Sequence, residues 1–243
     1  MSDFTARRVV ITGGAGGIGQ ATARAFLDRG AHVLLIDIEE DRLAAAREAL
    51  AGGSRVTTFA SALARPDQCA RALDRIEGKL HALVHLAGVF ERDALDPADH
   101  GVWDRAIAAN LTSAYDMCVA FIPRVDKAVA GRIVLTSTLA YRRGGVEHAA
   151  YSAAKGGIVG LTRALSRKLA PDVRVNAVAP GVITTRMTDE IIAERGERLL
   201  TEIPLKRYGT PAEVAGVIRF LCSDDASYVT GQTITIDGGM TNA

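Results

Sequence analysis

A tyrosine and a lysine four residues apart form the clearest catalytic pair in the chain. Tyr151 and Lys155 belong to the sequence Tyr-Ser-Ala-Ala-Lys, which opens a segment with a helical pattern. Residues at i and i+4 share one helix face, so the two side chains are neighbours. A free phenol has a pKa near about 10, and an ammonium about 4–5 Å away favours the phenolate by about 3–4 kcal/mol. The pair therefore predicts a general acid/base that exchanges a proton with a substrate oxygen near neutral pH.

A glycine-rich segment near the N-terminus predicts a phosphate-binding loop. The sequence Thr12-Gly13-Gly14-Ala15-Gly16-Gly17-Ile18-Gly19 follows a short apolar run and opens a helical segment. Glycines let backbone N–H groups approach a pyrophosphate, and a helix N-terminus adds a partial positive charge. A tight turn alone could also explain the glycines, but their place between a strand and a helix favours a dinucleotide. We expect cofactor contacts from Gly13, Gly16, Gly17, Ile18 and Gly19.

An acidic residue at the end of the second apolar run distinguishes between dinucleotides. Asp37 stands 18 residues after Gly19, where its carboxylate can accept hydrogen bonds from the adenosine ribose. The same carboxylate would repel a 2′-phosphate by roughly 1–4 kcal/mol per unit charge at about 4 Å. Ile38, a further expected cofactor contact, occupies a position where a basic residue could rescue NADP binding. The sequence thus favours NAD(H).

Short apolar runs alternate with helical segments from end to end. Strands are expected at residues 8–12, 32–37, 55–60, 81–86, 132–138, 174–178 and 233–236, and most read as continuous apolar runs, which is typical of a parallel sheet covered on both faces. Helical patterns cover residues 39–50, 67–77, 103–122, 149–169 and 212–221. The alternation predicts an α/β fold: a single Rossmann-type, doubly wound parallel sheet of about seven strands with helices on both faces.

One domain spanning residues 1–243 is expected, because no low-complexity linker, charge block or repeat divides the chain. Residues 182–207 form the longest interruption between expected strands and carry a helical pattern at 189–200. We interpret this segment as a flap that covers the substrate.

Composition excludes several classes of function. The 29 basic and 28 acidic residues leave a net charge of +1, and the lone Trp103 offers no stacking platform, so nucleic acid is not an expected partner. No 18 apolar residues run together, so no membrane span is expected. Cys69, Cys118 and Cys222 are scattered, which suits neither a disulfide framework nor a metal site. We expect a cytoplasmic protein that acts on a small molecule and needs no metal.

With these motifs the chain resembles the short-chain dehydrogenase/reductase family over nearly its whole length. The resemblance is carried by the Thr12–Gly19 loop, Asp37, Ala87-Gly88, Asn110, Tyr151 with Lys155, Pro180-Gly181 and the final Thr230-Gly231-Gln232 and Asp237-Gly238-Gly239. It implies that Tyr151 is the general acid/base, that Lys155 lowers its pKa and holds the nicotinamide ribose, and that Asn110 anchors a water in a proton relay.

The same resemblance assigns further cofactor contacts and an assembly. It implies a backbone pocket at Ala87 and Gly88, and contacts to the carboxamide from Pro180, Gly181, Ile183 and Thr185. Family members are usually tetramers, and the helices expected at 103–122 and 149–169 would then pack across subunits.

Three positions depart from the family pattern. Thr138 stands where the substrate-orienting serine is usual, and the adjacent Ser137 is the other candidate; we favour Thr138 because neighbours on a strand face opposite sides. His85-Leu86 replaces an Asn-Asn pair, and His85 is either a proton carrier or, as we favour, a packed strand histidine. Ala62-Leu63 replaces an Asp-Val pair, and Leu63 is expected to pack on the adenine.

Our leading hypothesis is an NAD(H)-dependent oxidoreductase that interconverts a secondary alcohol and a ketone. The pattern also resembles 3-oxoacyl-acyl-carrier-protein reductases, against which Asp37 argues because those usually take NADPH. A sugar, polyol or steroid dehydrogenase is equally open. The alternative of another class is a dinucleotide sensor without catalysis, against which the intact Asn110, Tyr151 and Lys155 argue.

Arginines near the expected site suggest one further interpretation. Arg142 and Arg143 precede Tyr151 and could recognise an anionic substrate. We favour the simpler reading that they belong to a solvated loop.

Overall fold

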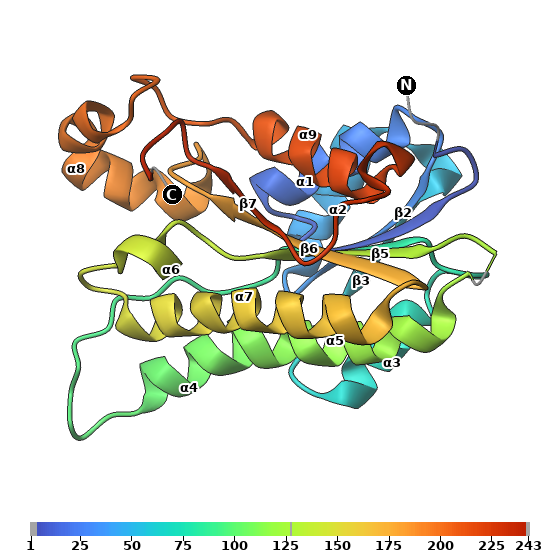
Figure 1. The fold of residues 1–243 in the computed structure, drawn as a ribbon, viewed down its shortest axis with the longest axis horizontal. Helices are drawn as coiled ribbons and strands as arrows, with labels where there is room; N and C mark the ends of the chain where they lie inside the picture. The colour runs from blue at the N-terminus through green and yellow to red at the C-terminus, as the bar shows by residue number, and fades with distance from the viewer. Residues whose placement is uncertain (1–3, 127, 242–243) are drawn as a thin grey trace.

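Seven parallel strands form one sheet, in the order β3-β2-β1-β4-β5-β6-β7, in a computed structural model that describes residues 4–126 and 128–241 (Figure 1). The order reverses between β1 and β4, as in doubly wound folds. Both the predicted fold class and all seven predicted strands are confirmed. The strands are β1 (Arg8–Thr12), β2 (His32–Asp37), β3 (Val56–Ala60), β4 (Ala82–His85), β5 (Gly131–Thr136), β6 (Val173–Pro180) and β7 (Thr233–Ile236).

Helices cover both faces of the sheet, as Figure 1 shows. Along β1, Val9 and Ile11 pack into one core and Val10 packs into the other, because successive side chains of a strand point to opposite faces. The first core is closed by α1 (Gly17–Leu27), α2 (Glu40–Leu50) and α9 (Pro211–Cys222), and the second by α3 (Pro66–Leu73), α5 (Ser113–Phe121) and α7 (Ala149–Leu169).

Strand β5 ends two residues earlier than predicted. Ser137 still donates its backbone N–H to Val178, but the chain then turns, and Tyr141 N bonds to the carbonyl of Thr138. A short helix that the sequence pattern did not indicate, α6 (Ala140–Arg143), follows. The predicted bounds of β3, β4 and β6 also shift by one or two residues, and α3 ends at Leu73 rather than at residue 77.

The helix predicted at residues 103–122 is interrupted. It consists of α4 (Gly101–Ile107), a π-helical turn (Ala108–Thr112) and α5. A π-turn adds one residue to the ring closed by each hydrogen bond and often marks a functional site. The continuous stretch Gly101–Arg124 is long and apolar enough to cross a membrane. However, Met117, Cys118 and Phe121 are fully buried against the sheet, so we assign this helix to the core.

The segment between β6 and β7 carries α8 (Asp189–Glu202), close to the predicted helix at 189–200. None of the residues of α8 is buried. The glycine loop, Gly88, Thr138 and Gly181 follow the carboxyl ends of strands in the sheet, and Asp37 is the last residue of β2. Ligands of doubly wound sheets bind at this edge, next to the point where the strand order reverses.

Candidate active site

Tyr151 lies in the first turn of α7, beside the hydroxyl of Thr138. Burial raises the pKa of Tyr151 to about 12, and the hydroxyl of Thr138, close to the phenol oxygen, acts in the opposite direction. Of the two hydroxyls that the sequence left open, Ser137 is 1 % exposed and donates to the carbonyl of Lys155 at 2.8 Å. Thr138 is the partly exposed one and is next to Tyr151. The structure therefore leaves only Thr138 placed to share a ligand with the phenol.

Lys155 lies one helical turn beyond Tyr151 and is almost completely buried. Its Nζ donates to the carbonyl of Thr136 at 2.9 Å and lies 5.7 Å from the centroid of the Tyr151 ring. Burial lowers the pKa of Lys155 to about 8. The predicted lowering of the Tyr151 pKa by this ammonium is not seen, because burial is the largest influence on both groups. A phenol with this pKa is protonated at neutral pH, so the pair is set to donate a proton.

Asn110 is held in the π-helical turn with one side-chain atom unused. Its Nδ2 donates to the carbonyls of Ala106 and Val89, each at 3.0 Å. Its Oδ1 is buried and has no hydrogen-bond partner within residues 4–126 and 128–241. A Cβ on Gly88 would lie 2.2 Å from this Oδ1 and 3.4 Å from Lys155 Nζ. The glycine therefore keeps open a small polar space that both side chains border.

The glycine loop forms a cradle that side chains would fill. A Cβ on Gly13 would lie 2.9 Å from Ala87 N, and one on Gly19 would lie 2.3 Å from Gly13 O. Gly16 precedes α1 in an extended conformation and offers no side-chain cap, so the first N–H groups of the helix are available to an anion. Thr185 lies against this loop, since a Cβ on Gly17 would be 3.2 Å from its Cγ2. The loop fits a pyrophosphate.

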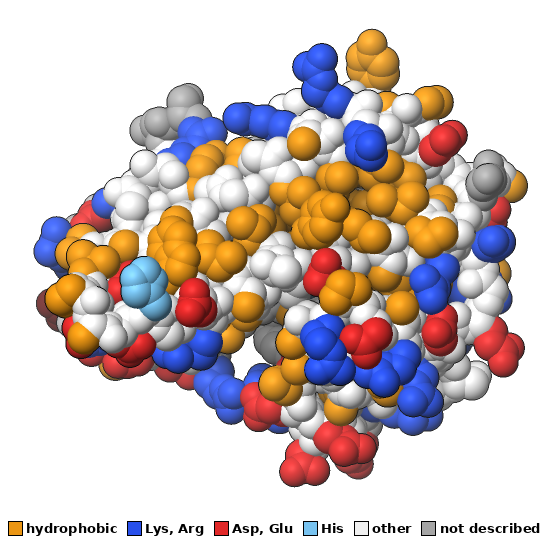
Figure 2. All heavy atoms as spheres, turned by 90° about the horizontal axis from the view of Figure 1, so that it is seen from below, with side chains coloured by type: hydrophobic (Ala, Val, Ile, Leu, Met, Phe, Trp, Pro, Cys, Tyr) orange, Lys and Arg blue, Asp and Glu red, His pale blue; other side chains and the backbone are white. Residues whose placement is uncertain are grey.

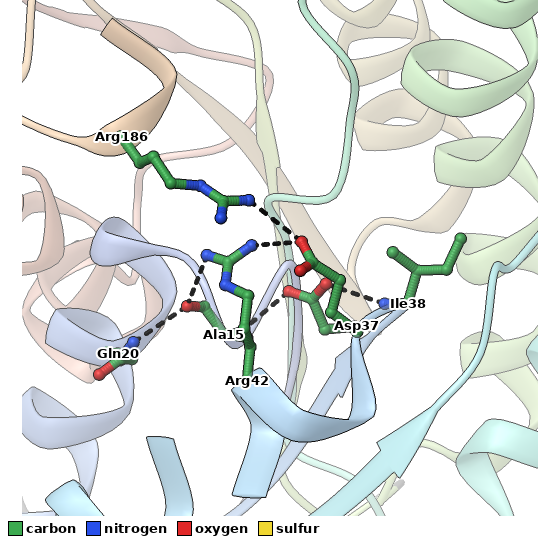
Figure 3. Close-up of polar contacts among 7 residues, drawn as sticks. Ala15, Gln20, Asp37, Ile38, Arg42 and Arg186 are labelled. Atoms are coloured by element: carbon green, nitrogen blue, oxygen red, sulfur yellow. Dashed lines mark hydrogen bonds and ion pairs between the residues drawn. The ribbon is translucent and has the colours of Figure 1, made fainter. Parts of the chain in front are cut away.

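Asp37, predicted to bind the adenosine ribose, is held in place by a hydrogen bond from the glycine loop. Its Oδ2 accepts from the backbone N–H of Ala15 at 3.0 Å, and its Oδ1 accepts from Ile38 N at 2.8 Å (Figure 3). Ile38 is 68 % exposed and available to a ligand. The predicted packing of Leu63 on the adenine does not fit the structure. Leu63 is 3 % exposed and packs in the core on the α5 side of the sheet. Its side chain is therefore not available to pack on an adenine.

His85 is a packed strand histidine, as favoured above. Its ring lies 3.0 Å from Thr12 Oγ1 through Nδ1 and 3.3 Å from Ser113 Oγ through Nε2. Ser113 spends its own proton on the carbonyl of Ala109, so Nε2 must be the donor and Nδ1 the acceptor. Burial, followed by the charge of Lys155, lowers the pKa of His85 to about 3. A neutral imidazole at this position is not a proton carrier near pH 7.

The loop after β6 brings the remaining predicted contacts to the same edge. Gly181 fits tightly, since its Cβ would lie 2.7 Å from that of Asp237. Thr185 and Thr188 cap one another and hold the turn that follows. Pro180 and Ile183 are buried, and Ile183 belongs to the core. Only their backbone groups are thus open to a ligand.

Ion pairs connect α8 with the rest of the site. Arg92 contacts Glu190 and Glu194, Arg195 contacts Glu147, and Arg143 contacts Glu202. Arg143 therefore already has a carboxylate partner, while Arg142 lies over the ring of Tyr141. These contacts argue against the anionic-substrate interpretation.

Two stacked rings beside Tyr151 were not predicted from the sequence. The rings of Phe90 and His148 are stacked, with centroids 4.0 Å apart, and Phe90 also meets Tyr151 edge-on at 4.9 Å. Burial lowers the pKa of His148. The available signal was an aromatic residue two positions after Gly88 and a histidine three before Tyr151, but only the fold stacks them.

Comparison with known proteins agrees with this geometry. The sequence profile of the family described as enoyl-(acyl carrier protein) reductase matches residues 13–241. A 3-oxoacyl-[acyl-carrier-protein] reductase of Thermotoga maritima is 37% identical over 236 residues, covering 95% of this chain and 96% of the relative. The crystal structure of a short-chain dehydrogenase/reductase from Brucella melitensis, described as a glucose/ribitol dehydrogenase, has a TM-score of 0.92 at 38% identity and covers 100% of both chains.

A second solved structure contains a cofactor. It is a 3-oxoacyl-[acyl-carrier protein] reductase with bound NAD from Brucella melitensis, with a TM-score of 0.89 and 34% identity, covering 98% of this chain and 92% of the other. The sheet topology and these matches together show that the protein is an oxidoreductase with a fold that binds a nicotinamide dinucleotide. The chain belongs to the short-chain dehydrogenase/reductase family.

Proposed function

We propose that the protein is an NAD(H)-dependent oxidoreductase that interconverts a secondary alcohol and a ketone. The observation that carries the proposal is that the hydroxyl of Thr138 lies beside the phenol of Tyr151, at the strand edge that also carries the glycine cradle. Two hydroxyls can both bond to one carbonyl oxygen, so they fix its position and polarise it.

The residues present divide the work of a carbonyl reduction. The dinucleotide, when bound, supplies the hydride. Tyr151, protonated at neutral pH, donates its proton to the substrate oxygen as negative charge develops there. Thr138 donates a second hydrogen bond and holds that oxygen. Lys155 Nζ and the unpartnered Oδ1 of Asn110 border one polar space, where a water can pass a proton back toward the tyrosine.

Asp37 supports the choice of NAD(H) over NADP(H). Its carboxylate stands at the end of β2 and touches the glycine loop, so a 2′-phosphate beside it would be repelled. The relative from Brucella melitensis with bound NAD is consistent with this preference. Replacing Asp37 by alanine should shift the preference toward NADPH, and unchanged selectivity would place the selector elsewhere.

A second candidate is reduction of a 3-oxoacyl thioester. Two similar proteins that are named 3-oxoacyl-[acyl-carrier-protein] reductases favour it, whereas the similar structure of a glucose/ribitol dehydrogenase favours a polyol. The absorbance of NADH at 340 nm, followed with a panel of ketones, sugars, polyols and a 3-oxoacyl thioester, separates these substrates. A preference for the 3-oxoacyl thioester would establish the second candidate, and a preference for another ketone or for a polyol would establish the first.

Tyr151→Phe tests whether the site catalyses at all. The variant should bind NADH as the wild type does and lose at least about a hundredfold in kcat, which is the usual contribution of a positioned acid. If wild type and variant bind NADH and are equally inert on the whole panel, the protein is a sensor and the proposed function is wrong.

We also propose that residues 1–243 form one domain with residues 182–207 as its flap, that the protein acts in the cytoplasm, and that it assembles as a homotetramer. Three free, buried cysteines suit a reducing compartment.

Exposed apolar side chains gather on the face formed by α4, α5 and α7 (Figure 2): Trp103, Tyr115 and Val119 are each about half exposed. A second copy of this face would cover them. Light scattering should give a tetramer, and Val119→Glu should reduce its size.

A further inference from the structure

Three charged side chains from different segments meet beside the glycine loop. Glu39 immediately precedes α2, Arg42 lies in the first turn of α2, and Arg186 begins the short turn before α8. Arg42 donates to Glu39 Oε1 at 2.6 Å, and Arg186 donates to the same oxygen at 3.1 Å (Figure 3). One carboxylate oxygen therefore brings two guanidinium groups together.

This group lies next to Asp37, through a single residue of the loop. Ala15 donates its N–H to Asp37 Oδ2, and its carbonyl accepts from Arg42 Nη2 at 3.1 Å. Arg42 and Asp37 thus hold opposite ends of the backbone of one residue. Two guanidinium groups side by side, next to the carboxylate expected to bind the ribose, are the groups that a 2′-phosphate would need.

We propose that Glu39 is a second determinant of dinucleotide specificity, which keeps Arg42 and Arg186 engaged and so denies them to a 2′-phosphate. The inference rests on the proposed binding of NAD(H) in this groove and adds a residue to it. Asp37 opposes the phosphate by direct repulsion. Glu39 acts differently: it pairs with Arg42 and Arg186, the two arginines that contact its carboxylate within the described residues.

The ion pairs are exposed enough to exchange partners. The side chain of Arg186 is 72% exposed and that of Glu39 is 46% exposed, and exposed pairs of this kind are weak. The hydrogen bond from Arg42 lowers the pKa of Glu39, so the carboxylate is ionised at neutral pH. Removing its charge would release Arg186 and would leave Arg42 with its bond to the carbonyl of Ala15, without disturbing a buried contact.

Binding of adenosine fragments tests the proposal without turnover. We would measure the Kd of 5′-AMP and of 2′,5′-ADP by calorimetry for the wild type and for Glu39→Gln. The variant should bind 2′,5′-ADP about tenfold more tightly relative to 5′-AMP, as one gained charge-assisted hydrogen bond allows. The ratio of kcat/KM for NADPH to that for NADH should rise by a similar factor.

Two further variants separate this role from a general effect of charge. Glu40→Gln removes the same charge from the adjacent, exposed residue and should change the affinity ratio less than about twofold, as expected for a solvated charge. In Glu39→Gln with Arg42→Gln and Arg186→Gln, the gain should disappear. A gain equal to that of Glu40→Gln, or one that survives loss of both arginines, would overturn the inference alone. Failure of the wild type to bind 5′-AMP at all would overturn the proposed dinucleotide site as well.

Discussion

Replacing His85 by asparagine should make the fold less sensitive to acid. His85 is 1 % exposed, and burial lowers its pKa to about 3. Its Nδ1 faces Thr12 Oγ1, an oxygen that already accepts the N–H groups of Leu86 and Ala87. A second ring proton would therefore have no acceptor, and the folded protein holds the imidazole neutral.

The size of the effect follows from proton linkage. A histidine in the unfolded chain has a pKa of about 6.5. Between that pH and about 3, the unfolded chain therefore binds a proton that the folded chain does not bind. The stabilisation is complete above about pH 6.5 and is lost as the pH falls. At pH 5 the loss is about 2 kcal/mol for His85. His81, whose pKa burial lowers to about 4, contributes about the same amount.

Urea denaturation at a fixed protein concentration measures this loss. The free energy of unfolding is compared at pH 7 and pH 5 for the wild type, His85→Asn and His100→Asn, the last replacing an exposed histidine. His85→Asn should reduce the pH-dependent loss by about 2 kcal/mol, whatever its stability at pH 7, and His100→Asn should leave it unchanged. An identical loss in all three proteins would refute a neutral, buried His85.

Three further predictions concern the site. Because burial lowers the pKa of Lys155 to about 8, its ammonium is present below that pH, and kcat for ketone reduction should fall as the pH rises above about 8; a kcat that stays constant to pH 10 would contradict this. Because α8 has no buried residue and is held by the pairs of Arg92, Arg195 and Arg143, raising the salt from about 0.05 to 0.5 M should raise the substrate KM several-fold, with Arg92→Gln already raised at low salt. A KM independent of salt in both proteins would exclude the flap. Because a Cβ on Gly19 would lie 2.3 Å from Gly13 O, Gly19→Ala should abolish NADH binding in a calorimetric titration, whereas Gly216→Ala, with nothing within 4 Å of its Cβ, should bind normally. NADH binding by Gly19→Ala would show that the loop is not closely packed.

The sheet could be predicted because its strands are buried on both faces. Such strands read as continuous apolar runs, and β1, β2 and β7 were placed to the residue. The ends of β5 and the helix α6 could not be predicted, since the chain turns at Leu139 because of tertiary contacts such as its N–H to Pro180 O. The π-turn around Asn110 was likewise hidden, because an added residue leaves a helical pattern almost unchanged.

The site could be predicted where one motif carries the chemistry and not where distant segments combine. Tyr151, Lys155 and the glycines were predicted from their spacing, and the structure brings them to one edge of the sheet. The cluster of Glu39, Arg42 and Arg186 joins residues up to 147 positions apart, and no local pattern indicates such a contact. Leu63 was misplaced for a similar reason: its positive φ of 51° turns the chain there, and its side chain enters the core.

The histidine that replaces a family amide shows how a departure from the motif can preserve the site. Thr12 follows directly into the glycine loop, and its hydroxyl holds Ala87 N as well as the ring of His85. The other side of the ring donates to Ser113, which in turn donates to the carbonyl of Ala109 inside the π-turn. The imidazole therefore links the dinucleotide loop to the turn that orients Asn110. An imidazole ring can bond to two partners on opposite sides, which a short amide could not reach together. The replacement therefore keeps Asn110 in register with the glycine loop.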